Sequence, residues 1–205
     1  MTPEEKQELL EIVSLFDIAE SKIKEIERLC GELSIPSLNQ LRYVGYHLTK
    51  AIAHDNEPHI FSEEIKCSKN HAKRAIYDTY EAGILYLLVE IKDFQLSSSN
   101  SSQLINALPN YMELCAKAQE ASNFLQKVRL EERDREKYYD QCEPHIEALK
   151  NIHYQFKTSA PIIRNLEVEA IEKSKKETRR FLTTISLSLL GISILVFLKL
   201  YFPQQ

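Results

Sequence analysis

The carboxyl-terminal stretch of this chain, Phe181 to Phe202, is the sequence feature that most constrains its fold. It opens with eighteen consecutive uncharged residues, Phe181 to Leu198, and its only charge is Lys199. A helix over the whole stretch would be roughly 33 Å long, which matches a hydrocarbon core of about 30 Å. We therefore predict one transmembrane helix at residues 181–202. The alternative interpretation is a buried helix of a soluble bundle.

Basic residues gather immediately before this stretch, five of them within eight positions: Lys173, Lys175, Lys176, Arg179 and Arg180. Only three residues follow Phe202. Basic residues beside a membrane span stay on the cytoplasmic side. The pattern thus predicts a single-pass, tail-anchored membrane protein whose amino-terminal domain is cytoplasmic, with the lipid bilayer as a partner.

The composition favours an all-α fold. Glycine is scarce at 4 residues and tryptophan is absent, whereas helix-forming residues are common. We expect an antiparallel helical bundle at residues 1–135, a helical stalk at 136–180 and the transmembrane helix after it. The formal net charge of -4 gives no nucleic-acid footprint for the whole chain. The four cysteines are isolated, so we expect no metal site and no cofactor.

Apolar periodicity and capping residues predict where the helices of the bundle lie. Thr2 to Glu5 forms a capping box for a first helix that reaches about Leu33, and Ser37 to Gln40 forms a second one. A long central helix is expected at about 58–96. The charged run at 129–138 is expected to form a solvent-facing helix that extends beyond the core.

Polar residues of the second and third predicted helices form the candidate site. His71, Arg74 and Asp78 follow one another at i, i+3 and i+7, so they share one helical face. Gly45, in the middle of the second helix, would let the third helix approach closely. The alternative to a functional polar cluster is an ion pair within one helix on a solvated face.

The pair Arg42 and His47 within a small helical bundle resembles the signature of the HEPN superfamily, whose dimeric members cleave RNA. The segment RAIYDTYEAGILYLL also resembles the Ala-rich inner helix of such bundles. The resemblance implies a metal-independent ribonuclease in which Arg42 stabilises the scissile phosphate and His47 transfers a proton. RNA is an expected partner only under this alternative.

The function that the sequence favours is binding. We expect the bundle to act as a sensor, adaptor or effector module at a membrane, with a protein partner or a second copy of the chain bound to it. The alternatives are the membrane-tethered HEPN-like ribonuclease, an inactive relative of one, and an effector that perturbs the membrane through its carboxyl-terminal helix.

Overall fold

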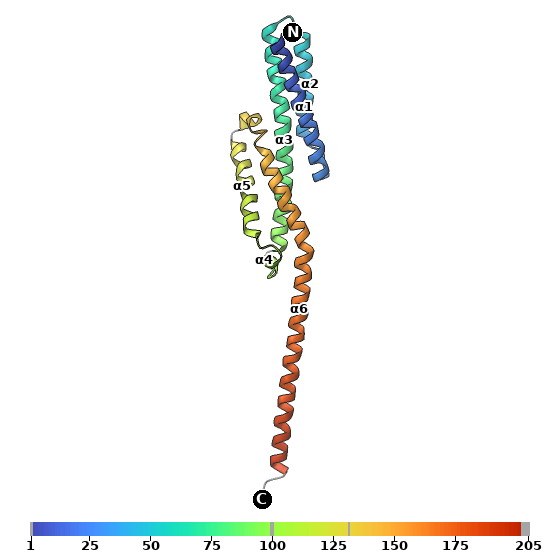
Figure 1. Cartoon of the computed structure of the whole chain (residues 1–205), viewed down its shortest axis with the longest axis vertical. Coiled ribbons are helices and arrows are strands. Elements are labelled where there is room, and N and C mark those ends of the chain that lie inside the picture. Colours follow the sequence, from blue (N-terminus) through green and yellow to red (C-terminus); the bar gives the residue numbers. More distant parts are fainter. Residues whose placement is uncertain (1, 99–100, 131, 202–205) are drawn as a thin grey trace.

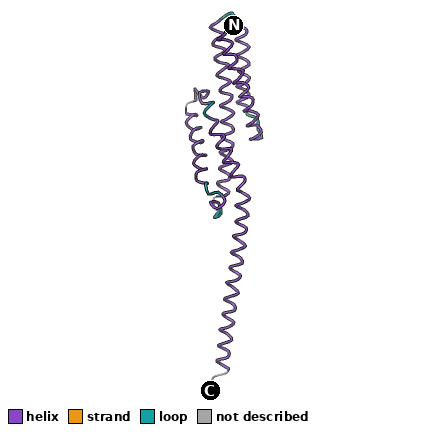
Figure 2. Tube along the Cα trace, viewed as in Figure 1, coloured by secondary structure: helices purple, strands orange, loops and turns teal. Residues whose placement is uncertain are grey.

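The structure is a computed structural model that describes residues 2–98, 101–130 and 132–201, without the side chains of 132–134 and 196–201. Every regular element in these ranges is helical, which confirms the predicted all-α bundle. Figures 1 and 2 show antiparallel helices packed at one end of the molecule, with one helix continuing far beyond them. In chain order the elements are α1 (Pro3–Cys30), α2 (Ile35–Ala53), α3 (Pro58–Ser98), α4 (Leu104–Ala107), α5 (Tyr111–Leu130), the 3-10 helix η1 (Glu132–Tyr138) and α6 (Cys142–Tyr201).

The capping box predicted at the start of α1 is confirmed. The backbone amide of Glu5 donates to Thr2 Oγ1 over 3.2 Å, and Thr2 N donates to Glu5 Oε2 over 2.7 Å. The helix ends at Cys30 because Gly31 takes a left-handed conformation with φ of 73°, which favours glycine. The second predicted capping box is wrong, because α2 begins at Ile35 and Ser37 is buried within its first turn.

The long helix α3 is the centre of the bundle and contacts α1, α2, α5, α6 and η1. Its amino-terminal half packs on α1 and α2, while its carboxyl-terminal half packs on α5 and α6 (Figure 1). The predicted apolar stripe of this helix lies in the core, where its buried members include Phe61, Ile65, Ala72, Ile76, Tyr80, Leu87 and Ile91.

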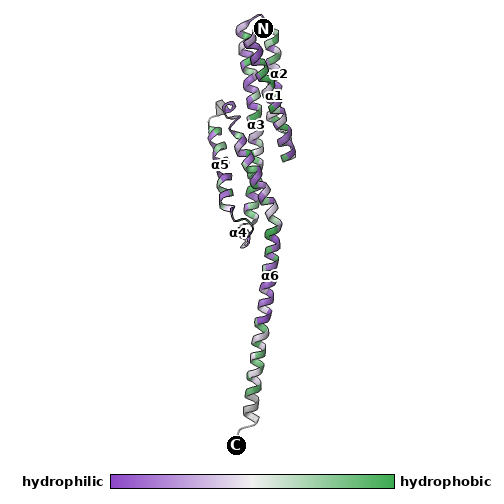
Figure 3. Ribbon diagram, viewed as in Figure 1, coloured by the Kyte–Doolittle hydropathy of each residue, from purple (hydrophilic) through white to green (hydrophobic). Residues whose placement is uncertain are grey.

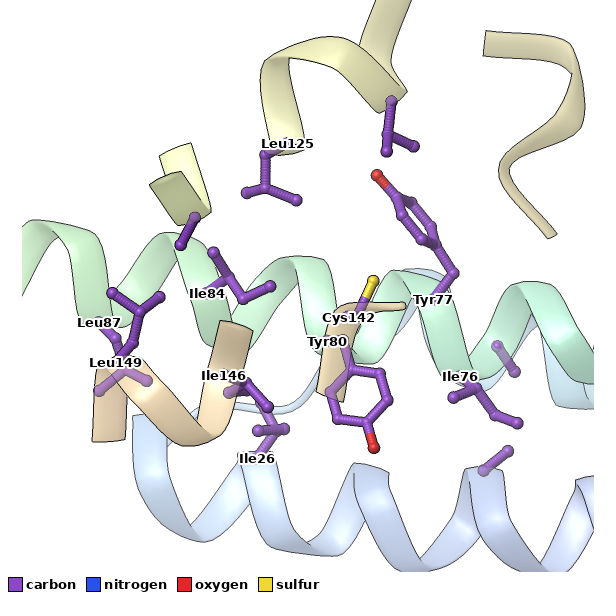
Figure 4. Close-up of a cluster of buried hydrophobic side chains, with 14 of the residues drawn as sticks. Ile26, Ile76, Tyr77, Tyr80, Ile84, Leu87, Leu125, Cys142, Ile146 and Leu149 are labelled. Atoms are coloured by element: carbon purple, nitrogen blue, oxygen red, sulfur yellow. The ribbon is translucent and has the colours of Figure 1, made fainter. Parts of the chain in front are cut away.

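Side chains of two other helices approach α3 closely at Gly83. A Cβ atom at this position would lie 2.6 Å from Ile146 Cδ1 of α6 and 2.7 Å from Ile26 Cδ1 of α1. Figure 4 shows both isoleucines in this part of the core. No atom lies within 4 Å of a Cβ built on Gly45, so the close approach predicted there is wrong. The close approach occurs instead at Gly83, because the missing Cβ of this glycine leaves room for isoleucine side chains from α1 and α6.

The helix α6 has two environments. Its first part lies in the bundle, where its buried side chains run from Cys142 to Ile163, so the core continues past residue 135. Pro161 lies inside the helix without ending it. From Arg164 to Arg180 the helix leaves the bundle as a mostly exposed rod, and Figure 3 shows that apolar residues follow this hydrophilic segment.

The transmembrane helix predicted at residues 181–202 is corrected by the structure. Among the described residues, no helix is long and apolar enough to cross a membrane. Phe202 itself lies outside the described residues.

Candidate functional site

A cleft of about 810 Å³ lies where the α1–α2 connection, α3, the end of α5 and η1 meet. Apolar, polar and charged side chains all line it. The lining residues are Leu33, Ser34, Pro36, Gln40, Arg74, Asp78, Glu81, Ala82, Leu85, Arg129 and Arg135.

Two arginines from later in the chain contact Glu81 of α3 at the edge of the cleft. Arg129 Nε donates to Glu81 Oε1 over 2.8 Å, and Arg135 Nη1 lies 4.0 Å from Glu81 Oε2. The carboxylate is only 14% exposed, so these contacts act in a partly desolvated setting. The charged run at 129–138 therefore folds back onto α3 in part as η1, and the prediction that it extends beyond the core is wrong.

Arg74 and Asp78, both predicted as members of the polar cluster, line the cleft together. Arg74 Nε is buried, and no acceptor among the described residues is within hydrogen-bond distance of it. Burial raises the pKa of the Asp78 carboxyl and the negative charge of Glu81 adds to this, while Arg74 and Arg135 oppose the shift. Desolvation thus disfavours the ionised form of Asp78, and the two arginines compensate for only part of this effect.

His71, the third member of the predicted cluster, lies beside the cleft and packs against α2. Its Nδ1 is 2.7 Å from Gln40 Oε1, and its ring stacks between those of Tyr43 and His47 at centroid distances of 5.1 and 5.0 Å. Burial lowers the pKa of His71, and the nearby charges of His47 and Arg74 lower it further. The lowered pKa favours the neutral form of the His71 imidazole.

Gln40 connects the two parts of the site, because its side chain reaches both His71 and Asp78. Sequence reasoning did not select Gln40, Glu81 or the arginines that pair with Glu81. A signal for Glu81 existed, since it follows Arg74 by seven residues and so shares its helical face. No comparable local pattern points to Gln40 or Arg129, which lie on other helices.

The structure gives Arg42 and His47 separate neighbours. His47 Nδ1 lies 2.5 Å from Glu64 Oε2, and Lys50 Nζ donates to the other oxygen of this carboxylate over 3.3 Å. The His47 contact is the main cause that lowers the pKa of Glu64. The Arg42 guanidinium lies over the ring of Tyr43 at 5.1 Å. The catalytic roles that the HEPN resemblance implies stay a prediction.

The predicted membrane-proximal basic residues all lie on the exposed rod of α6, away from the cleft. They are Lys173, Lys175, Lys176, Arg179 and Arg180. Within the part of the chain that the structure describes, no group of three or more His, Cys, Asp or Glu residues is arranged to hold a metal ion. Comparison with protein-family models, with curated proteins and with solved structures found no match.

Proposed function

We propose that this protein is a binding module that the end of α6 holds at a lipid bilayer. The observation that carries the proposal is the separation of two surfaces along one molecule. The cleft lies in the bundle. An exposed apolar segment lies far along α6 (Figures 1 and 3).

The apolar end of α6, Phe181 to Leu195, exposes large apolar side chains on every side of the helix. Nine of them are at least 40% exposed: Phe181, Leu182, Ile185, Leu187, Leu189, Leu190, Ile192, Ile194 and Leu195. Contiguous exposed apolar surface of this kind marks a contact with a partner. Lipid is a partner that can cover such side chains.

The basic residues of the rod support lipid as that partner. Each lysine or arginine near an anionic leaflet contributes about 1 kcal/mol of attraction, although Glu172 and Glu177 reduce the sum. The cytoplasmic leaflet carries the anionic lipids. We therefore place the bundle in the cytoplasm.

The bundle is then held away from the lipid surface. Phe181 follows Cys142, the first residue of α6, by 39 residues, which is about 58 Å along a straight helix. The cleft lies beside η1, just before Cys142, so it faces the solution rather than the bilayer. Such a geometry suits a module that captures a ligand or partner from solution near a membrane.

Flotation with vesicles tests the lipid contact. The full chain and a chain that ends at Arg180 are mixed with vesicles that contain phosphatidylserine and centrifuged through a density gradient. We expect the full chain to float and the shorter chain to stay at the bottom, with the same thermal melt of the bundle, because the core ends at Ile163. Flotation of the shorter chain, or a full chain that stays at the bottom, would contradict the proposal.

A further inference from the structure

Two histidine rings stack where α2 meets α3. The ring centroids of His47, on α2, and His71, on α3, lie 5.0 Å apart, and the ring planes are 15° from parallel. Tyr43 of α2 also stacks on His71, at a centroid distance of 5.1 Å. Both histidines are only partly exposed, so a positive charge on either ring is incompletely solvated. The pair therefore joins the two helices through a contact whose strength depends on protonation.

The two rings differ in what faces their Nδ1 atoms. His47 Nδ1 lies 2.5 Å from Glu64 Oε2, so a positive charge on His47 faces a carboxylate. His71 Nδ1 lies 2.7 Å from Gln40 Oε1. An amide oxygen accepts a hydrogen bond from the neutral ring, but it has no formal charge that would offset a second proton. The stack thus accommodates one positive charge more readily than two.

The charged groups around His71 mostly oppose its protonation. Among the side chains that the structure describes, they are His47 of α2, Arg74 of α3 and Glu136 of η1. Burial is the main cause that lowers the pKa of His71, His47 and Arg74 lower it further, and Glu136 acts in the opposite direction. Because this pKa is lowered in the fold, the neutral ring stabilises the fold above the unfolded value of 6.5. This contribution is lost as the pH falls below that value.

We infer that the stacked pair of His47 and His71 is a pH-sensitive switch, which keeps α2 packed on α3 while His71 is neutral and loosens α2 when both rings are protonated. This regulation goes beyond the proposed function. It bears on the cleft, because Gln40 contacts His71 and also lines the cleft. The effect is expected in α2 and not in α1, since both rings lie at the contact of α2 with α3.

Hydrogen exchange of the α2 amides tests the switch. The full chain is kept in neutral detergent at pH 7.5 and at pH 5.5, and each protection factor is corrected for the intrinsic exchange rate at that pH. We expect the protection of the α2 amides to fall about fivefold at pH 5.5 relative to that of the α1 amides, because a pKa difference of one unit corresponds to about a tenfold change in an opening equilibrium and only part of it is reached at this pH.

Phenylalanine variants test the contribution of each ring. His71→Phe keeps an aromatic ring in the stack but cannot be protonated, so the fall at pH 5.5 should disappear. His47→Phe removes the neighbouring charge and leaves the burial of His71, so the fall should shrink to about twofold. His145→Phe is the matched control, because His145 also stacks on an aromatic ring, that of Phe124, and burial lowers its pKa, but it lies on α6. Thermal melts at pH 7.5 check that each variant is folded.

The inference is overturned if the protection of α2 falls no more than that of α1. It is also overturned if His71→Phe or His47→Phe shows the full fall of the unchanged chain, or if His145→Phe abolishes the fall. None of these results depends on the lipid contact, because hydrogen exchange is measured in detergent and reports on α2.

Discussion

At the scale of single residues, two buried tyrosines of α3 differ in whether their hydroxyl groups have partners. Tyr77 is fully buried and its hydroxyl has no hydrogen-bond partner among the described residues, so burial raises its pKa. Tyr80 leaves α3 on the other side, towards α1 (Figure 4). Its hydroxyl reaches Lys22 and Glu143, and burial is the main cause that raises the pKa of Tyr80 to about 12.

Removing these two hydroxyls should have opposite effects on stability. We expect Tyr77→Phe to raise the free energy of unfolding by about 1 kcal/mol, because it deletes a buried polar group without a partner. Tyr80→Phe should lower it by about 1 kcal/mol, because the hydroxyl is no longer present beside the charged groups of Lys22 and Glu143. Urea unfolding followed by circular dichroism measures both values. A loss for Tyr77→Phe equal to that for Tyr80→Phe would show that the Tyr77 hydroxyl has a partner.

Two glycines within helices of the bundle, Gly83 and Gly45, allow a second pair of substitutions. Gly83→Val should cost about 1–3 kcal/mol, because the new side chain would collide with Ile26 and Ile146. Gly45→Ala should instead stabilise by up to about 1 kcal/mol, because the site is open and alanine favours the helix. Denaturant midpoints compare the two variants. Destabilisation by Gly45→Ala without an effect of Gly83→Val would contradict the packing described here.

At the scale of elements, ion pairs join α1 to the start of α6. Lys22 Nζ donates to Glu143 Oε1 over 2.8 Å, and Lys150 pairs with Glu25. These contacts lower the pKa of Glu143 and of Glu25, and in each case the hydrogen bond from the lysine is the largest cause. Because these groups are partly exposed, each pair contributes less than about 1 kcal/mol.

These ion pairs predict how stability depends on pH. A carboxyl whose folded pKa is depressed stabilises the fold above its unfolded pKa, 4.5 here, and loses this contribution as the pH falls through the folded value. Asp78 has the opposite effect on stability. Its raised pKa means that the ionised carboxylate destabilises the fold, and protonation at low pH removes this destabilisation. In an Asp78→Asn background, the melting temperature should therefore fall between pH 5 and pH 3.

The double variant Lys22→Met, Lys150→Met in the same background is the control for this experiment. Its melting temperature should change less between pH 5 and pH 3, because neither Glu25 nor Glu143 keeps its lysine partner. An equal fall in both proteins would assign the acid sensitivity to other carboxyl groups.

Local sequence patterns predicted those features of the helices that depend on residues close together in the chain. The capping box of Thr2 and Glu5 and the apolar stripe of α3 depend on residues within a few turns, and both are present. The folding back of the 129–138 run depends on Glu81, about 50 residues earlier, so its charge pattern alone indicated an exposed helix. The cleft could be predicted only in part for the same reason: Arg74 and Asp78 share a helical face, but the side chains opposite them come from other elements.

At the scale of the whole molecule, α6 connects the bundle to the apolar end for which a lipid contact is proposed. Buried residues hold the first part of this helix in the bundle as far as Ile163. The rod then carries charged side chains, and the apolar end follows it. The helical stalk predicted at 136–180 did not indicate where α6 leaves the bundle, because that point depends on contacts with the other helices.

The absence of tryptophan from the chain permits a direct measurement of this medium. A single tryptophan is placed in the full chain at Leu189, in the apolar end, or at Val168, in the rod, where both side chains are exposed. Each protein is bound to phosphatidylserine vesicles whose acyl chains carry bromine, which quenches tryptophan fluorescence on contact. We predict strong quenching for Leu189→Trp and none for Val168→Trp, since the two positions are about 32 Å apart along the helix. Equal quenching at both positions, or no quenching at position 189, would contradict the proposal that the apolar end of α6 contacts lipid.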